Sequence, residues 1–276
     1  MSGNSLKLKK FDPSIINSNS VVLLIGKRGT GKTTLTADVL YHLRSSFDAG
    51  IAFSATEESN NFWSRHICDT LIHQDFNAKV YGNFVAEQRR INAKLEKPIN
   101  SFALLEDCMY SRILKTDPNV RGSFFNGRHW NIFLIMTMQY VLDLPPELRS
   151  NVDYIFILRN NVLADRERIW KHFCGFIPSF NIFQQIMNKC TTGYECLVVN
   201  NTSRSNEIDD CLFWYKAQVY DSFRIGRPQM WIYHYKMKKI TDCEREVEDD
   251  DQTYYEDLVG INSQNMNRKI NIKKMC

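Results

Sequence analysis

The sequence predicts an α/β fold in which a mainly parallel central sheet is covered by helices on both faces. Two observations predict this fold. Short apolar runs rich in β-branched residues alternate along the chain with longer stretches of helical character. One of these runs leads directly into a glycine-rich loop and then into a helix-compatible segment, which is the strand, loop and helix order of a phosphate-binding unit.

The apolar runs predict five strands in the main sheet and two further strands at one edge. The main strands are expected at residues 21–25, 51–54, 102–105, 132–136 and 154–158, and the edge strands at 195–199 and 213–216. Helices are expected at residues 32–43, 60–72, 86–95, 164–173 and 180–188. Helical connections between strands allow neighbouring strands to run parallel.

The charge of the chain is unevenly distributed. The 276 residues include 35 Lys and Arg and 31 Asp and Glu, for a net charge of +4. Residues 242–257 hold nine acids and one base, so the rest of the chain has 34 bases against 22 acids, an excess of 12. A basic surface of this kind favours a polyanionic partner.

The sequence divides into two parts. Residues 1–240 hold all the predicted strands and helices and are expected to form one domain. Residues 241–276 hold the acidic run and a basic, Asn-rich end without periodic apolar residues, and are expected to form a charged, mobile tail.

Several classes of protein are excluded. The longest apolar runs are far shorter than the roughly 18 residues of a membrane-spanning helix, so no membrane span is expected. The lysines near the start are followed by polar residues 12–20 and not by the apolar stretch of a secretory signal. The eight cysteines show no C-x-x-C spacing and are interpreted as reduced thiols. Four possible zinc ligands match no familiar spacing and are set aside: His172, Cys174, Cys190 and Cys196.

The clearest motif is a match to G-x-x-x-x-G-K-[ST] after the first main strand. Its residues, with the threonine that follows, are Gly26, Lys27, Arg28, Gly29, Thr30, Gly31, Lys32, Thr33 and Thr34. Glycines let successive backbone N–H groups and the next helix N-terminus face phosphate oxygens. Lys32 is expected to reach the β- and γ-phosphates and Thr33 to ligate Mg²⁺. Nucleotide is therefore expected at these residues.

Two adjacent acids and a glutamine complete the candidate catalytic set. Glu106 and Asp107 follow the apolar strand 102–105, as in a Walker B element. Their order is unusual, since Asp followed by Glu is the usual order. The simple assignment makes Glu106 the acid on the Mg²⁺ side and Asp107 the base for water, and it leaves an exchange of roles open. Gln139 follows the next strand and is expected at the same sheet edge, near the γ-phosphate.

These residues resemble a known family. The segments GKRGTGKTT, LLEDC, FNGRHWNI, TMQY and LPPELRSNVDYIF resemble the genome-packaging ATPases of nucleocytoplasmic large DNA viruses, a branch of the FtsK–HerA superfamily. The likeness covers roughly residues 12–235, with the motifs in the order of the family. It implies a RecA-like P-loop fold of the ASCE division, with ATP and Mg²⁺ as cofactors.

The resemblance also implies a function. Such a protein is expected to form a homo-oligomeric ring, to hydrolyse ATP and to translocate double-stranded DNA into a preformed capsid through capsid or portal components. An arginine from the neighbouring subunit usually completes each site, and the candidates are Arg149, which is favoured, Arg128 and Arg166. Sequence-independent contacts with DNA are expected from basic residues around the Walker B strand, among them Arg65, Arg89, Arg90, Lys94, Arg112, Lys115 and Arg121. A soluble, non-secreted protein in the host cytoplasm, at virus assembly sites, or in the virion is expected.

Other functions stay open at this point. A nucleoside or small-molecule kinase would use the same loop, but no Arg-rich lid is evident. A GTP-dependent switch would need the base-recognition motif N-K-x-D. The pair Asn188-Lys189 is followed by Cys190 and Thr191, which argues against guanine specificity. A non-catalytic scaffold does not need the acid pair. A cellular DNA-pumping ATPase of the same superfamily would normally carry additional domains. The acidic tail could be a solvated segment, a DNA mimic or a capsid-docking arm.

Overall fold

The computed structural model describes residues 6–55, 57, 61–108, 111–140, 144–205, 207–232, 234–236 and 238. The chain divides into two compact units, Met1–Met230 and Trp231–Cys276. In the second unit, helical residues bring the rings of Trp231, His234 and Tyr235 into contact. The predicted tail, residues 241–276, lies outside the described residues.

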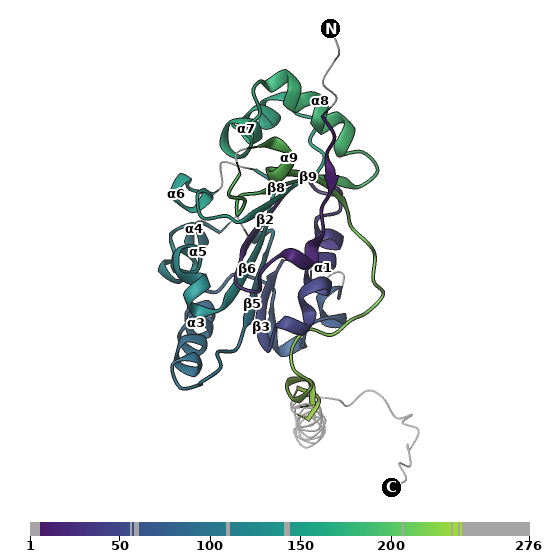
Figure 1. Cartoon of the computed structure of the whole chain (residues 1–276). Coiled ribbons are helices and arrows are strands. Elements are labelled where there is room, and N and C mark those ends of the chain that lie inside the picture. The colour runs from purple at the N-terminus through teal and green to yellow at the C-terminus, as the bar shows by residue number, and fades with distance from the viewer. Residues whose placement is uncertain are drawn as a thin grey trace, which may run out of the picture. The chain divides into compact units, whose positions relative to one another are not determined.

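The first unit is built on one sheet (Figure 1). The described strands are ordered β1-β9-β8-β7-β2-β6-β5-β3-β4 across it. Neighbours from β7 to β4 run parallel, whereas β8 is antiparallel to both β7 and β9. The strands are β1 (Lys9–Lys10), β2 (Val21–Ile25), β3 (Ala49–Ser54), β4 (Ile72–His73), β5 (Ser101–Glu106), β6 (Ile132–Met138), β7 (Tyr154–Ile157), β8 (Glu195–Asn200) and β9 (Leu212–Lys216).

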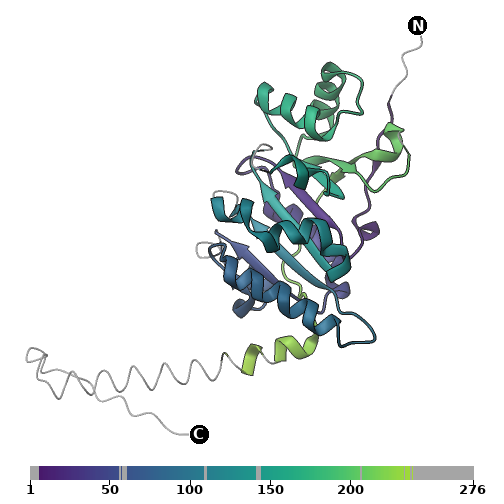
Figure 2. The ribbon, with the colours of Figure 1, turned by 90° about the vertical axis from the view of Figure 1, so that its left-hand side faces the viewer.

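Helices cover both faces of the sheet. Figure 1 shows α1 on one side and α3 and α5 on the other, and Figure 2 shows α3 and α5 lying across that second face. The helices are α1 (Lys32–Leu43), α3 (Ala78–Asn92), α4 (Arg112–Thr116), α5 (Pro118–Trp130), α6 (Pro146–Arg149), α7 (Leu163–Phe173), α8 (Phe180–Cys190) and α9 (Ile208–Cys211). Short 3₁₀ turns are η1 (Pro13–Ile15), η2 (Arg44–Ser46), η3 (Trp63–Arg65) and η4 (Asp69–Leu71). Among the described residues, no helix is both long and apolar enough to cross a membrane.

The side chains of strand β2 pack in two hydrophobic cores, one on each face of the sheet. All five of its side chains are buried. Alternate side chains of a strand point to opposite faces. Val21, Leu23 and Ile25 therefore pack in the core under α3, α5, α7 and α8, while Val22 and Leu24 pack in the core under α1. A continuous apolar run is what a strand buried on both faces requires.

The predicted fold class and the seven predicted strands are confirmed. The strand at 21–25 and the helix at 32–43 have the predicted bounds. The other strands agree within two residues at either end. The predicted helix 86–95 overlaps the second half of α3 but extends three residues past its end at Asn92. The helix begins earlier than predicted because the Asn77 side chain caps it by accepting from the N–H groups of Lys79 and Val80.

The helix predicted at residues 60–72 is wrong. The described part of this segment holds η3, η4 and the short strand β4. The Glu57 carboxylate accepts hydrogen bonds from the N–H groups of Trp63 and Ser64, at 2.7 and 2.9 Å. The Trp63 indole donates to Glu106, which is distant in the sequence. These bonds to the carboxylates of Glu57 and Glu106 outweigh the local helical pattern.

Helix α5 was not predicted, although its ends carry clear signals. Pro118 occupies the first turn, and the Asp117 carboxylate accepts from the N–H groups of Asn119 and Val120, each at 2.9 Å. The helix ends at Asn131, whose φ of 53° is left-handed. Two internal glycines weaken the helical pattern of the sequence.

The end of α5 is fastened to the start of two strands. Arg128 pairs with Asp153, and the other Asp153 oxygen accepts from the Val21 N–H at 2.9 Å. Asp153 is buried and directly precedes β7. The segments FNGRHWNI and LRSNVDY are thus joined through Arg128 and Asp153, at the amino end of the parallel strands.

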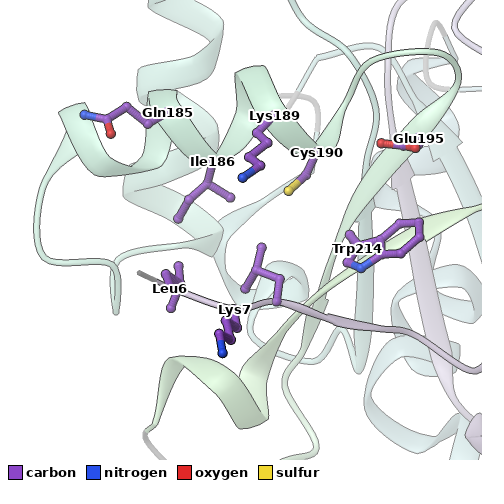
Figure 3. A pocket seen from close by; sticks show the side chains of 9 residues that line it. Leu6, Lys7, Gln185, Ile186, Lys189, Cys190, Glu195 and Trp214 are labelled. Carbon is purple, nitrogen blue, oxygen red and sulfur yellow. The ribbon is translucent and has the colours of Figure 1, made fainter. Parts of the chain in front are cut away.

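A mostly apolar cavity of about 530 Å³ lies where the N-terminal segment passes α8 (Figure 3). Leu6, Ile186 and Trp214 contribute apolar walls, and the charged residues of the described lining are Lys7, Lys189 and Glu195. The described lining includes no residue of the glycine-rich loop. The phosphate-binding residues therefore gather elsewhere.

Candidate active site

The parallel sheet brings the predicted site residues to one edge. The glycine-rich loop follows β2, Glu106 ends β5, and Gln139 follows β6. β2 pairs with β6 so that Ile25 is opposite Met138, and β3 pairs with β5 so that Ser54 is opposite Glu106. Ligands bind at the carboxyl ends of strands in sheets of this kind.

The loop has the backbone shape of a phosphate cradle. Gly29 and Gly31 have φ values of 77° and 95°, which side chains of L-residues rarely adopt. The Lys27 carbonyl accepts from the Thr30 N–H at 3.4 Å and from the Thr30 hydroxyl at 2.7 Å, which closes the turn. Helix α1 begins at Lys32 with no side chain capping its N-terminus. Its first N–H groups and its dipole are therefore available to an anion.

Lys32 is buried beneath this loop with its ammonium between two oxygens. Its Nζ lies 3.4 Å from the Lys27 carbonyl oxygen and 3.5 Å from Asp107 Oδ1. Only 6% of Lys32 is exposed. A buried ammonium held at the mouth of a phosphate cradle is suited to neutralising phosphate charge.

One cavity of about 580 Å³ is lined by residues of the glycine-rich loop, by Lys32 and by the side chains of Asp107 and Gln139. The described residues that line it are Arg28, Gly29, Gly31, Lys32, Thr33, Thr34, Asp107, Gln139 and Tyr194. The predicted loop, the second acid and the glutamine are thus brought together. Such a cavity, with convergent polar groups and a glycine-rich wall, suits the phosphates of a nucleoside triphosphate.

Glu106 is a buried carboxylate that accepts three hydrogen bonds. Thr33 Oγ1 donates to its Oε1 at 2.6 Å, while Ser54 Oγ and Trp63 Nε1 donate to its Oε2 at 2.7 and 2.6 Å. Only 2% of Glu106 is exposed. Thr33 and Glu106 present adjacent oxygens, the ligand chemistry of Mg²⁺ with a nucleotide phosphate. These residues therefore fit the predicted metal.

The Asp107 carboxylate lies beside Lys32, whereas the Glu106 carboxylate binds Thr33. The Asp107 backbone has a left-handed φ of 50°, and its N–H donates to the Thr137 hydroxyl at 2.9 Å. Its carboxylate lies beside Lys32 and lines the cavity with Gln139. The next residue, Cys108, is buried, and desolvation followed by the charges of Glu106 and Asp107 raises the pKa of its thiol to about 12. Burial and a raised pKa make this thiol a poor nucleophile at neutral pH.

The three candidate arginines have different surroundings. Arg128 is paired with Asp153 at the amino end of the strands, away from the loop. Arg166 donates to the Asn160 carbonyl at 2.5 Å and to Asn188 Oδ1 at 2.7 Å. Arg149 Nη1 is buried and has no hydrogen-bond partner among the described residues. Of the three, Arg149 is the one with a buried guanidinium nitrogen that makes no hydrogen bond to the described residues.

The predicted DNA-contacting residues come from several elements of the fold. Arg89 and Arg90 line a cavity with His129 and Trp130, near the amino ends of β5 and β6, and Arg89 lies over the Trp130 ring. Arg121 pairs with Glu147 at 3.0 Å. Of the remaining candidates, Arg65 belongs to η3, Lys94 follows α3, and Arg112 and Lys115 belong to α4.

The possible zinc ligands do not carry a metal site. Among the described residues, no group of three or more His, Cys, Asp and Glu side chains is placed to hold a metal ion. Cys174 and Cys196 are buried, and Cys190 is a free thiol beside the cavity at α8. A magnesium ion held by one carboxylate, one hydroxyl and nucleotide phosphates needs no such group.

Sequence patterns missed four residues of this site. Ser54 and Trp63 bind Glu106, Thr137 holds Asp107, and Tyr194 lines the cavity. Ser54 and Thr137 lie at or near the carboxyl ends of predicted strands, and that position was the available signal. Trp63 and Tyr194 come from segments with no motif.

Comparisons with known proteins identify the family and the fold of the chain. The chain is 32% identical over 237 residues to uncharacterized protein 088R of Invertebrate iridescent virus 3, covering 80% of this chain and 90% of that protein. The chain belongs to this family of large-DNA-virus proteins. Other members of the viral family are uncharacterized protein 015R of Frog virus 3, 32% identical over 82% of this chain and 70% of its own length, and uncharacterized protein L437 of Acanthamoeba polyphaga mimivirus, 27% identical over 100% and 99%. No protein-family model matches the chain.

Solved structures show the same fold. The DNA-packaging ATPase B204 from Sulfolobus turreted icosahedral virus has a TM-score of 0.56 and 17% identity, covering 74% of this chain and 100% of B204. The genome-packaging NTPase B204 of Sulfolobus turreted icosahedral virus 2, in complex with AMPPCP, has a TM-score of 0.55 and 16% identity over 74% of this chain and 100% of its own. The viral family therefore has the fold of a P-loop ATPase. The predicted likeness to packaging ATPases is confirmed.

The Trp63 contact with Glu106 can be tested by a double-mutant cycle. Trp63→Phe removes a donor to a buried carboxylate and is expected to lower the free energy of unfolding by about 1.5–3 kcal/mol. The same substitution in a Glu106→Gln background is expected to cost about 1 kcal/mol less, because a neutral acceptor binds the indole more weakly. Urea denaturation measures both.

Trp170→Phe is the matched control for this cycle, since the Trp170 indole donates to the neutral Ile177 carbonyl at 3.1 Å. Its cost is expected to be equal in both backgrounds. Equal costs of Trp63→Phe in the two backgrounds would contradict the contact.

Proposed function

We propose that this protein is an ATP-hydrolysing motor that translocates double-stranded viral DNA into preformed capsids. The observation that carries the proposal is the single cavity in which the glycine-rich loop, Lys32, Asp107 and Gln139 meet. Water is the acceptor that suits this set, because a carboxylate and an amide flank the place where the terminal phosphate would end. The chain belongs to a family of proteins from large DNA viruses and has the fold of B204, and both findings support the packaging role.

In this proposal the chain's own groups hold and activate the reactants. The loop N–H groups and Lys32 bind the β- and γ-phosphates, and Thr33 and Glu106 hold Mg²⁺. Mg²⁺ held by these two residues would neutralise charge on the phosphate oxygens. Asp107 accepts a proton from the attacking water, and Gln139 orients that water. The side-chain exposure of Asp107, 26%, leaves it accessible to water, whereas Glu106 is buried.

The proposal includes a homo-oligomeric ring whose neighbouring subunits complete each other's sites. Arg149 is the arginine proposed to act across the interface, because its Nη1 finds no partner among the described residues of its own chain. An arginine that reaches the transferring phosphoryl group stabilises its charge.

The remaining predictions enter the same proposal. Residues 1–240 are proposed as the ATPase domain, and the charged segment 241–276 as a separate tail. DNA is bound through its phosphates by the basic surface, without sequence preference. Capsid or portal components are the proposed assembly partners, and the host cytoplasm or the virion the proposed location.

Binding and hydrolysis should separate between two variants. Lys32→Ala is expected to abolish ATP binding because it removes the buried ammonium of the cradle. Asp107→Asn is expected to bind ATP and to hydrolyse it about 10²–10⁴-fold more slowly, because the base is lost. Calorimetric ATP binding and phosphate release measure the two effects.

Lys171→Ala, on the exposed face of α7, is the control and should retain both activities. A larger loss of turnover in Glu106→Gln than in Asp107→Asn, at unchanged ATP affinity, would exchange the roles of the two acids. Near-normal turnover in Lys32→Ala would contradict the active site.

Complementation tests the arginine proposed to act in trans. Arg149→Ala and Lys32→Ala are each expected to be inactive alone. In a ring that mixes the two variants, an Arg149→Ala subunit still has an intact phosphate-binding loop, and a neighbouring Lys32→Ala subunit still has Arg149. Such a pair forms one complete site, so part of the ATPase activity should return. Arg166→Ala, whose guanidinium is engaged within its own chain, is the comparison and should not require complementation. Absence of any recovery in mixed rings would exclude Arg149 from acting across the interface.

Double-stranded DNA should stimulate phosphate release if the protein is a translocase. Stimulation is expected with DNA of any sequence, and DNA affinity should fall at least roughly tenfold between 50 and 200 mM salt because phosphate contacts release counterions. Phosphate release is measured with and without DNA, and with nucleosides as alternative acceptors. Transfer of phosphate to a nucleoside, without DNA stimulation, would favour the kinase over the motor.

A further inference from the structure

We propose that residues 217–227, which follow β9, form a strap that positions the Trp63 indole against Glu106 through His66. His66 is then a positioning residue, which acts on the metal-binding carboxylate through Trp63 and not by contact with it. The inference rests on the proposed role of Glu106 in holding Mg²⁺ and adds the segment of the chain that keeps this carboxylate in place.

The strap has an irregular backbone and is held by segments that are distant in the sequence. Figure 1 shows it running from β9 past α1. Tyr220 stacks on Tyr41 of α1, with ring centroids 3.6 Å apart. At the end of the strap, the Arg227 N–H donates to the Asp48 carbonyl at 3.1 Å, and the two side chains form an ion pair. Beyond it the chain continues to Trp231, where the second unit begins.

The middle of the strap is fastened to His66. This residue is 1% exposed, and its ring stacks on the Phe223 ring with centroids 4.1 Å apart. His66 Nδ1 lies 3.2 Å from both the backbone nitrogen and the carbonyl oxygen of Phe223. In one tautomer it accepts from that N–H, and in the other it donates to that carbonyl. The Ile225 N–H also donates to the His66 carbonyl, at 3.0 Å.

Trp63 lies between two anchors of η3. The Glu57 carboxylate accepts from the N–H groups of Trp63 and Ser64 at the start of this turn. The His66 N–H donates to the Trp63 carbonyl at 2.8 Å at its end. A single 3₁₀ turn has little stability of its own, so its anchors fix the direction of the indole. That indole donates to Glu106 Oε2 at 2.6 Å.

Packing joins the strap to Trp63 as well. Phe223 and Ile225 are the buried residues of the strap, and both belong with Trp63 to the core under α1. A close-packed core transmits a displacement from one side chain to the next. Burial, the largest cause, lowers the pKa of His66, so its ring is neutral at neutral pH. The effect of His66 on Glu106 is therefore one of position and not of charge.

The first measurement follows the Trp63 indole N–H by NMR in the full chain without nucleotide or metal. A short hydrogen bond to a carboxylate moves the proton resonance of its donor downfield. The Trp63 resonance is the one that Trp63→Phe removes. His66→Phe keeps a ring and loses Nδ1, so the indole resonance should move upfield as the bond lengthens. His66→Asn restores a polar group near the Nδ1 position and should reverse part of this shift.

The second measurement is calorimetric ATP affinity with Mg²⁺ and with EDTA. His66→Phe is expected to weaken ATP binding about three- to tenfold with Mg²⁺ and less than about twofold with EDTA, because removing the support of a metal-binding carboxylate lowers metal affinity. Phe223→Leu removes the stacked ring, keeps the backbone contacts and should show the same selective loss. In a Trp63→Phe background, His66→Phe should cause no further loss, because it acts through the indole.

Tyr81→Phe is the matched control. It removes a buried hydrogen bond of 2.8 Å to Ser123 in the core on the other face of the sheet. It should change neither the Trp63 resonance nor either affinity.

The outcomes separate the strap from the proposed function. An unchanged Trp63 resonance in His66→Phe and Phe223→Leu would overturn the strap while the proposed function stands. So would equal losses of ATP affinity with Mg²⁺ and with EDTA, or a further loss from His66→Phe in the Trp63→Phe background. If His66→Phe does not fold, Phe223→Leu decides the same comparison. A wild-type chain that neither binds nor hydrolyses ATP with Mg²⁺ would overturn the proposed function, and the role of the strap with it.

Discussion

The buried carboxylate of Glu106 is the constraint on which the arrangement of the site depends. A charged group in the interior is tolerated only when hydrogen bonds replace its water. Three donors do so here: Thr33 at the start of α1, Ser54 at the end of β3 and Trp63 in η3. One carboxylate therefore fixes the position of the phosphate-binding helix relative to two strands. The same bonds place the Thr33 hydroxyl and a carboxylate oxygen side by side, as a metal ion bound to nucleotide requires.

The sequence segments that carry the resemblance to packaging ATPases divide between the two ends of the sheet. The loop, the acids and Gln139 lie at the carboxyl ends of the strands, where the cavity is. Arg128 and Asp153, from the other two motifs, join each other at the amino ends and hold the first residue of β2. These two residues are therefore structural in this chain. They keep β2 between its neighbours, so that its loop meets residues from both sides.

Two of the four described non-glycine residues with a left-handed φ lie at the site. Asp107 and Tyr194 have left-handed φ values, and both line the loop cavity. Each costs conformational energy that packing elsewhere must offset. In this conformation the Asp107 carboxylate lies beside Lys32, while the Glu106 carboxylate binds the Thr33 hydroxyl. Two adjacent acids thus contact different residues of the site. Asn131, also left-handed, ends α5 and has the ordinary role of a helix cap.

The sequence by itself determined the fold class, the β2 strand, the loop and α1, because their signals are local: an apolar run, glycines at fixed spacing and a helix that follows at once. It also determined Glu106, Asp107 and Gln139 as a group, since parallel strands carry their ends to one edge. Only the tertiary structure decided that residues 63–73 form turns and a short strand. The Trp63 indole bonds to a carboxylate 43 residues away, and no local pattern records that contact. It likewise decided which acid faces Thr33 and which faces Lys32, and that Tyr194 stands beside the loop, because these positions depend on buried charge and on packing between distant segments.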